Sequence, residues 1–250
     1  MAVDNGKKPE MGCKFSRSVK VLPSMCDGKS LLSIPAALDM FQNTATLHAD
    51  HFDIGPEGMN RRNYFWIITK TRIHMNRMPE MMEDVSANTW IQAPERASCE
   101  RDYSITDPDG EVLAYGRSIW AVISRDTGRL VQMKDLYPEL DFNKLPPDDK
   151  PFLKLGKNFE DAEEIGKYTI RSVDIDLGGH MNNVNYVRSM LGCFTSEELR
   201  DMNICELELN FISQSYEGDT LRFLRRKTEE GIDIGAVNPE GKVAFIARIS

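Results

Sequence analysis

Residues 174–186 carry side chains suited to acyl-transfer chemistry, at a spacing that can bring them together. Asp176 and His180 can supply an acid and a base, because an imidazole titrates near neutral pH. Gly178 and Gly179 lie between them and have no Cβ, so the backbone there can approach a substrate closely. We therefore predict that Asp176 and His180 act together and that Gly178 contacts the substrate.

A helix is expected directly after this stretch, over residues 183–200. Asn182 and Asn183 are both of the type that caps helices. N–H groups at such a start can stabilise an oxyanion, and the N–H of Gly179 is the predicted donor. We expect Asn183 to cap the helix, which leaves Asn182 to orient His180 or the substrate.

The composition indicates a folded globular protein of 250 residues, 41% of them hydrophobic. Its formal net charge of −8 argues against nucleic acid as the main partner. Five cysteines are widely spaced and include no C-x-x-C pair: Cys13, Cys26, Cys99, Cys193 and Cys205. Reduced thiols are therefore expected, with a cytoplasmic location and no metal site or redox cofactor.

No targeting or membrane-spanning segment is expected from the sequence. Residues 1–8 are charged and contain no apolar run. Nowhere does the chain approach the roughly 18 uninterrupted apolar residues of a membrane helix.

Two parts of the chain repeat the same order of signals. Hairpin turns are predicted at 107–112 (DPDGEV) and 238–243 (NPEGKV), each followed by an apolar strand. A helix is predicted upstream of each, over 34–49 with Ser33 as its N-cap and over 183–200. The repeat implies two copies of one α+β unit.

Further strands complete each unit. Short strands are expected at 15–22 and 167–173, and residues 64–75 form the longest strand candidate. A proline-rich, charged stretch separates the copies and is typical of a linker on the surface. We therefore predict an N-terminal unit over 10–136, a linker over 137–164 and a C-terminal unit over 165–250.

This organisation resembles the acyl-acyl carrier protein (acyl-ACP) thioesterases of the plant and bacterial type. Segments matching that family, in the same order, are Phe41–Ala45, Trp66–Lys70, Asp84–Val85, Asn88–Trp90, Ser118–Trp120 and Asp174–Tyr186. The resemblance implies two tandem hotdog units, each an antiparallel sheet wrapped around a central helix, packed as an intrachain pseudo-dimer. It also implies that the first unit recognises the acyl chain and that the second carries the catalytic residues.

The resemblance implies roles for individual residues as well. Asp176 takes the position of the family's acid, as nucleophile or as base for water, and His180 that of the family's histidine. Two polar groups of the plant-type site differ: Gly178 replaces a frequent asparagine, and Gln214 falls where an acidic residue is expected. Gln214 cannot take up a proton, but its amide can orient water. Ser215 stands where plant enzymes often have cysteine, which argues against a cysteine nucleophile.

A hotdog pair encloses an acyl tunnel. Met40, Phe41 and Trp66 are therefore candidates for contacting the chain and setting its length. One buried methylene contributes about 0.8 kcal/mol, so a single bulky side chain can shift the preferred length.

The expected function is hydrolysis of a fatty acyl-ACP to free acid and ACP, in fatty acid biosynthesis. An acyl-CoA thioesterase, a hotdog hydratase and a non-catalytic acyl-thioester binder are the alternatives. Residues 29–35 of the first copy lack the Asp, Gly-Gly and His of the second, so one active site is expected. Either a monomer or a homodimer fits, because the internal pair already completes a hotdog dimer.

Overall fold

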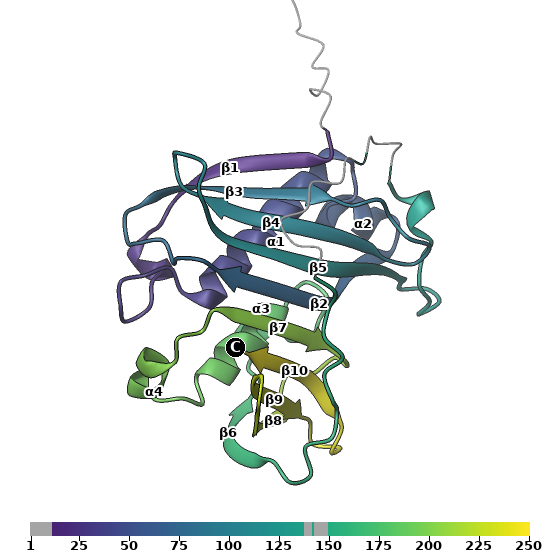
Figure 1. The fold of residues 1–250 in the computed structure, drawn as a ribbon. Helices are drawn as coiled ribbons and strands as arrows, with labels where there is room; N and C mark the ends of the chain where they lie inside the picture. The colour runs from purple at the N-terminus through teal and green to yellow at the C-terminus, as the bar shows by residue number, and fades with distance from the viewer. Residues whose placement is uncertain (1–11, 138–141, 143–149) are drawn as a thin grey trace, which may run out of the picture.

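The computed structural model describes residues 12–137, 142 and 150–250. Ten strands of this described part form one antiparallel sheet in the order β1-β3-β4-β5-β2-β7-β10-β9-β8-β6 (Figure 1). The strands are β1 (Lys14–Lys20), β2 (Tyr64–Met75), β3 (Asp84–Ile91), β4 (Cys99–Thr106), β5 (Val112–Ser124), β6 (Glu163–Thr169), β7 (Glu206–Phe211), β8 (Thr220–Thr228), β9 (Gly231–Val237) and β10 (Val243–Ile249). The α-helices are α1 (Ile34–His51), α2 (Pro56–Arg61), α3 (Asn183–Leu191) and α4 (Ser196–Asp201).

The strand order divides the sheet into two equivalent halves. The first half is β1-β3-β4-β5-β2 with α1, and the second is β7-β10-β9-β8-β6 with α3. β2 and β7 join the halves through antiparallel pairing from Lys70–Asn210 to His74–Glu206. Figure 1 shows both long helices packed against the same face of the sheet. Each half is thus a hotdog unit, and the predicted α+β fold of two tandem units packed as an intrachain pseudo-dimer is confirmed.

The local signals of the repeat are confirmed where the structure describes them. Ser33 caps α1 by accepting a hydrogen bond from the Ala36 N–H. In the two hairpins the side chains of Asp107 and Asn238 accept bonds from the backbone N–H groups of Glu111 and Lys242. The same asparagine or aspartate chemistry therefore closes both turns.

The second helix is shorter than predicted. α3 ends at Leu191, with Gly192 as its C-cap, and a separate helix α4 begins at Ser196. Thr195 caps α4 in a reciprocal pair with Glu198. The prediction of one helix to residue 200 is wrong, because a strong second N-cap follows the glycine.

The linker and unit boundaries stay predictions. Residues 138–141 and 143–149 of the predicted linker lie outside the described residues, as does the predicted start of the first unit at residue 10. β6 begins at Glu163, just inside the C-terminal end of the predicted linker. The described linker residues pack on the sheet rather than run free, since Leu155 and Phe159 are buried against the second half.

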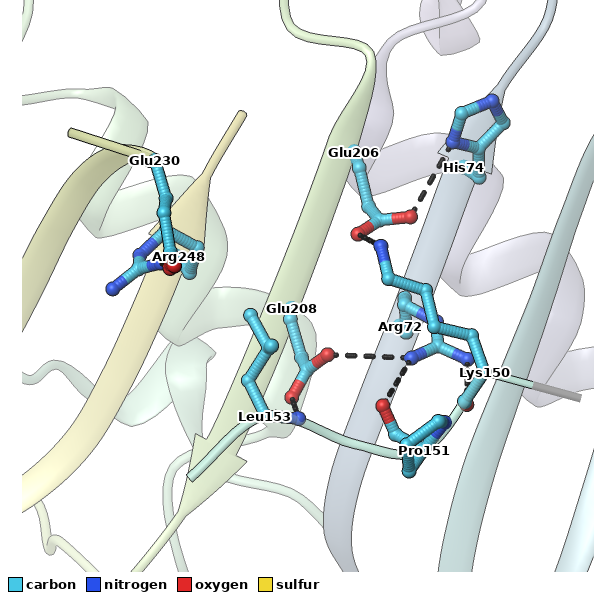
Figure 2. A network of polar contacts seen from close by, with 9 residues as sticks. All are labelled: Arg72, His74, Lys150, Pro151, Leu153, Glu206, Glu208, Glu230 and Arg248. Carbon is cyan, nitrogen blue, oxygen red and sulfur yellow. Dashed lines mark hydrogen bonds and ion pairs between the residues drawn. The ribbon is translucent and has the colours of Figure 1, made fainter. Parts of the chain in front are cut away.

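A network of polar contacts holds residues 150–153 across the junction of β2 and β7 (Figure 2). Arg72 and Glu208 lie opposite each other on these strands, are each 1% exposed and form an ion pair at 3.4 Å. Arg72 also donates to the carbonyls of Lys150 and Pro151, and Glu208 accepts from the Leu153 N–H at 2.5 Å. The linker is thereby bonded to both halves.

No helix among the described residues has the length and apolar character needed to cross a membrane.

Candidate active site

Residues 175–181 form a tight loop that places Asp176 and His180 side by side. Ile175 and Met181 form a bridge at its base, and the Asp176 N–H donates to the His180 carbonyl at 2.9 Å. Gly179 turns the chain with a φ of +79°, a conformation that favours glycine. The two predicted catalytic residues therefore stand opposite each other on the two arms of the loop.

Gly178 leaves the space in which the two side chains meet. Its N–H donates to Asp176 Oδ1 at 2.7 Å. A Cβ at this position would lie 3.0 Å from Asp176 Oδ1 and 3.2 Å from His180 Nδ1. The carboxylate and the imidazole thus face the same small volume, which the absence of a Cβ at Gly178 leaves open.

The surroundings of His180 favour its neutral form. Burial lowers the pKa of the imidazole, the Asp176 charge opposes this, and the Arg125 charge adds to it. Phe65 of β2 lies 6.4 Å from the ring between centroids. Because Phe65 and Arg125 belong to the first half, the site is built where one unit meets the other.

Tyr216 connects His180 to Gln214 and is a residue that the sequence reasoning missed. Its ring meets the imidazole edge-on at 5.3 Å, and its hydroxyl donates to Gln214 Oε1 at 3.3 Å. Gln214 is exposed and follows β7, as expected for a group that meets solvent and substrate. In the sequence, only the position of Tyr216 two residues after Gln214 indicates that it belongs to the site.

The two asparagines exchange the roles predicted for them. Asn182 is the N-cap of α3, and its Oδ1 accepts from the Val184 N–H at 2.8 Å. Asn183 is the first residue of the helix and lines the cavity described below. The prediction that Asn183 is the cap is wrong, and the carbonyl oxygen of the Asn182 side chain is already engaged.

The N–H of Gly179 is not available as an oxyanion donor. It donates to the Asp176 carbonyl at 3.0 Å inside the loop, and α3 begins four residues later. The predicted role of this N–H is therefore wrong, because the loop is a closed turn and not the helix start itself. Among the described residues none accepts a hydrogen bond from the Asn183 N–H, which makes it the better candidate.

A narrow cavity, with about 20 Å³ of room for water-sized molecules, lies between the two halves at the start of α3. Its walls come from α1, β2, β4 and β5 of the first half and from α3 and β7 of the second. The lining residues are Leu38, Phe41, Gln42, Ile68, Thr71, Tyr103, Ser118, Trp120, Asn183, Val184, Leu209 and Phe211. The mixture of aliphatic and aromatic walls suits an acyl chain.

Of the three residues predicted to contact that chain, Phe41 alone lines this cavity. Met40 is 1% exposed and belongs to the core beside α1. Trp66 packs toward α2, and its indole N–H donates to the carbonyl of Ile54, which precedes that helix, at 2.8 Å. Trp120 lines the cavity instead, and Trp66 contacts Trp120 edge-on.

The first half contains the same loop without the histidine. Cys26 and Leu32 form its bridge, and Asp27 accepts from the Lys29 N–H at 2.8 Å, as Asp176 accepts from Gly178. The expectation that the first copy lacks the aspartate is therefore wrong. Leu31 stands where His180 stands in the second copy, so the imidazole distinguishes the two loops.

Comparison with known proteins identifies relatives over most of the chain. Residues 12–140 match the family model of the acyl-ACP thioesterase N-terminal domain, and residues 157–241 match that of the C-terminal domain. A chloroplastic palmitoyl-acyl carrier protein thioesterase of Cuphea hookeriana is 30% identical over 72% of this chain and 46% of its own length. A chloroplastic acyl-[acyl-carrier-protein] hydrolase of Cuphea viscosissima is 28% identical over 80% of this chain and 52% of its own length. The chain thus spans about half the length of these curated relatives.

Two solved structures share the fold closely. An acyl-ACP thioesterase from Bacteroides thetaiotaomicron superposes with a TM-score of 0.83 at 23% identity, covering 94% of this chain and 96% of the other. A 12:0-ACP thioesterase from Umbellularia californica gives a TM-score of 0.81 at 22% identity, with 96% and 97% covered.

Proposed function

The chain belongs to the acyl-ACP thioesterase family, and from this premise we propose that it hydrolyses a fatty acyl thioester to a free acid and a thiol. The observation that carries the proposal is the Asp176 carboxylate and His180 imidazole facing one volume beside Gly178. The narrow cavity between the two hotdog units, with Asn183 and Val184 of α3 in its wall, is the proposed place for the acyl chain, and its walls must move apart to admit one.

His180 acts as the general base in the proposed mechanism. Burial lowers its pKa, so the ring is neutral at neutral pH and can take a proton from water. The water oxygen then bonds to the thioester carbon. When the tetrahedral intermediate collapses, the carbon–sulfur bond breaks and the imidazolium returns the proton to the leaving thiolate.

Asp176 supports this cycle electrostatically. Its negative charge raises the pKa of His180 against the effect of burial and stabilises the imidazolium while it carries the proton. The route in which Asp176 itself attacks the thioester is the alternative. Rapid quenching of a single turnover separates the two, because direct attack releases the thiol before the free acid and leaves the acyl group on the Asp176 carboxylate as a mixed anhydride.

Three further groups complete the site in this proposal. The Asn183 N–H, at the positive end of α3, stabilises the oxyanion. Gln214, held by the Tyr216 hydroxyl, orients the attacking water. Asn182 keeps the helix start in place through its cap.

We take the substrate carrier to be ACP. The names of the curated relatives specify acyl carrier protein. An acyl-CoA thioesterase is the second candidate, because coenzyme A presents the same phosphopantetheine arm.

We also propose a cytoplasmic location and a monomer or homodimer. All five cysteines are free, which agrees with a reducing compartment. The two units already pair within one chain through β2 and β7, so a second chain is not needed to complete the fold.

Thiol release from acyl-ACP and acyl-CoA of one chain length tests the proposal. Asp176→Asn and His180→Gln should each reduce kcat by about 10² or more. Asp27→Asn is the matched control, since it alters the equivalent loop of the first half, and should keep the wild-type rate. Absence of release from every thioester would contradict hydrolysis, and full activity of both second-half variants would contradict the mechanism alone.

A further inference from the structure

Three polar groups lie together in the wall of the cavity, on β4 and β5. The Trp120 indole N–H lies 2.5 Å from Ser118 Oγ and 3.1 Å from the Tyr103 hydroxyl oxygen. The two hydroxyl oxygens are 2.8 Å apart. Tyr103 is 2% exposed and Ser118 is 1% exposed, so the group is shielded from bulk water.

One proton of this cluster cannot be satisfied within it. The indole only donates, so the Tyr103–Ser118 contact uses one of the two hydroxyl protons and leaves the other free. No other described residue accepts a hydrogen bond from either hydroxyl. A buried donor without a partner is costly, which indicates that something else in the cavity accepts this bond.

The cavity offers other polar side chains as well. Gln42, Thr71 and Asn183 line it, and among the described residues none hydrogen-bonds their side chains. A cavity built only for methylene groups would have no use for so many available donors and acceptors.

Resting on the proposed function, we propose that the acyl chain this site prefers carries an oxygen atom, as a keto or hydroxyl group, which accepts the hydrogen bond from Tyr103 or Ser118. The cavity has room for about one water molecule, which would satisfy the free hydroxyl when no chain is bound. A methylene group that displaces such a water cannot replace its hydrogen bonds, whereas a chain oxygen can. The cluster therefore selects for oxygenated acyl chains over saturated ones.

The test compares acyl-ACPs of one chain length: saturated, with a keto group on the β-carbon, and with a mid-chain hydroxyl. For the wild type, kcat/KM should be about tenfold or more higher for at least one oxygenated chain than for the saturated chain. The Tyr103→Phe/Ser118→Ala double variant should lose most of this preference, measured as the ratio of kcat/KM for the oxygenated chain to kcat/KM for the saturated chain. Ser104→Ala is the control. It removes a buried serine hydroxyl on β4 that does not line the cavity, so this variant should keep the preference.

The outcomes separate this inference from the proposed function. Hydrolysis of the saturated chain at a rate equal to or above both oxygenated chains overturns the inference and leaves the thioesterase activity standing. An equal preference in the double variant also overturns it. If no thioester is hydrolysed, binding of the corresponding free acids, measured by calorimetry, decides the inference by itself: tighter binding of an oxygenated acid supports it, and equal binding overturns it.

Discussion

Both halves have an aspartate at the same position of the same loop, but only the aspartate of the second half has a histidine beside it. Asp27 and Asp176 each accept a backbone N–H two residues along, so shaping the turn is a role they share. The second loop differs by having His180 in place of Leu31 and Gly178 in place of Lys29. The carboxylate acquires a chemical partner only where both changes occur.

The state of His180 predicts the pH dependence of hydrolysis. Because burial lowers its pKa below the usual 6.5, the neutral base persists into weakly acid solution. Activity should rise with pH as the ring loses its proton, so the acid limb of kcat/KM should have its midpoint below pH 6.5. A midpoint above this value would contradict the proposed base.

Arg125→Gln provides the matching perturbation. The Arg125 charge helps to lower the pKa of His180, so its removal should raise that pKa and move the acid limb to higher pH. The shift should be small, because Arg125 is exposed and solvent screens its charge. Arg129→Gln, also at an exposed arginine, serves as the control and should leave the profile unchanged.

Gly178→Ala should impair catalysis without unfolding the protein. The new methyl group would lie 3.0 Å from Asp176 Oδ1 and 3.2 Å from His180 Nδ1, so the two side chains must move apart by a few tenths of an ångström. We expect kcat to fall about tenfold or more, because the reacting groups lose their alignment. Gly28→Ala changes the first-half loop, where a Cβ meets nothing within 4 Å, and should leave kcat unaltered. Equal rates for the two variants would argue against a catalytic need for the space that Asp176 and His180 share at Gly178.

At the scale of elements, the two neighbouring asparagines at the start of α3 should have different roles, one in stability and the other in substrate binding. Asn182→Ala removes the N-cap and should lower the free energy of unfolding by about 1 kcal/mol. Asn183→Ala leaves the cap intact and changes the cavity wall, so it should reduce kcat/KM with little effect on stability. Urea unfolding and acyl-ACP kinetics of both variants measure this contrast. The reverse pattern would restore the roles that the sequence suggested.

Elements whose signals are local could be predicted from the sequence. Ser33 and the two hairpin turns act through bonds to residues no more than four positions away, so their sequence patterns suffice. The long strand at Tyr64–Met75 was predicted with its observed bounds. The choice between Asn182 and Asn183 was not accessible in this way, because either residue type can cap and only the path of the preceding loop decides.

At the scale of the whole molecule, the cavity depends on contacts that no local pattern reports. Thr71, Ser118 and Leu209 lie on three adjacent strands and are brought to one level by the register of β5, β2 and β7. Neighbouring helix positions such as Met40 and Phe41 point in different directions, so both are buried in the core but only Phe41 also lines the cavity. That Asp176 and His180 lie together could be predicted because they are four residues apart, whereas Phe65 and Arg125 reach His180 only through the packing of the two units.

The junction of the two units should depend on the buried Arg72–Glu208 pair (Figure 2). Glu208→Gln keeps an acceptor for the Leu153 N–H but removes the negative charge beside a buried guanidinium, and should lower the free energy of unfolding by about 3–5 kcal/mol. The Arg72→Met/Glu208→Met double variant should cost less, because neither member of the buried pair is then left as an unpaired charge. Glu163→Gln breaks the pair with Arg225, in which Glu163 is 63% exposed, and should cost less than about 1 kcal/mol. Urea unfolding of the three variants tests this: if Glu208→Gln costs no more than Glu163→Gln, the buried Arg72–Glu208 ion pair does not stabilise the junction.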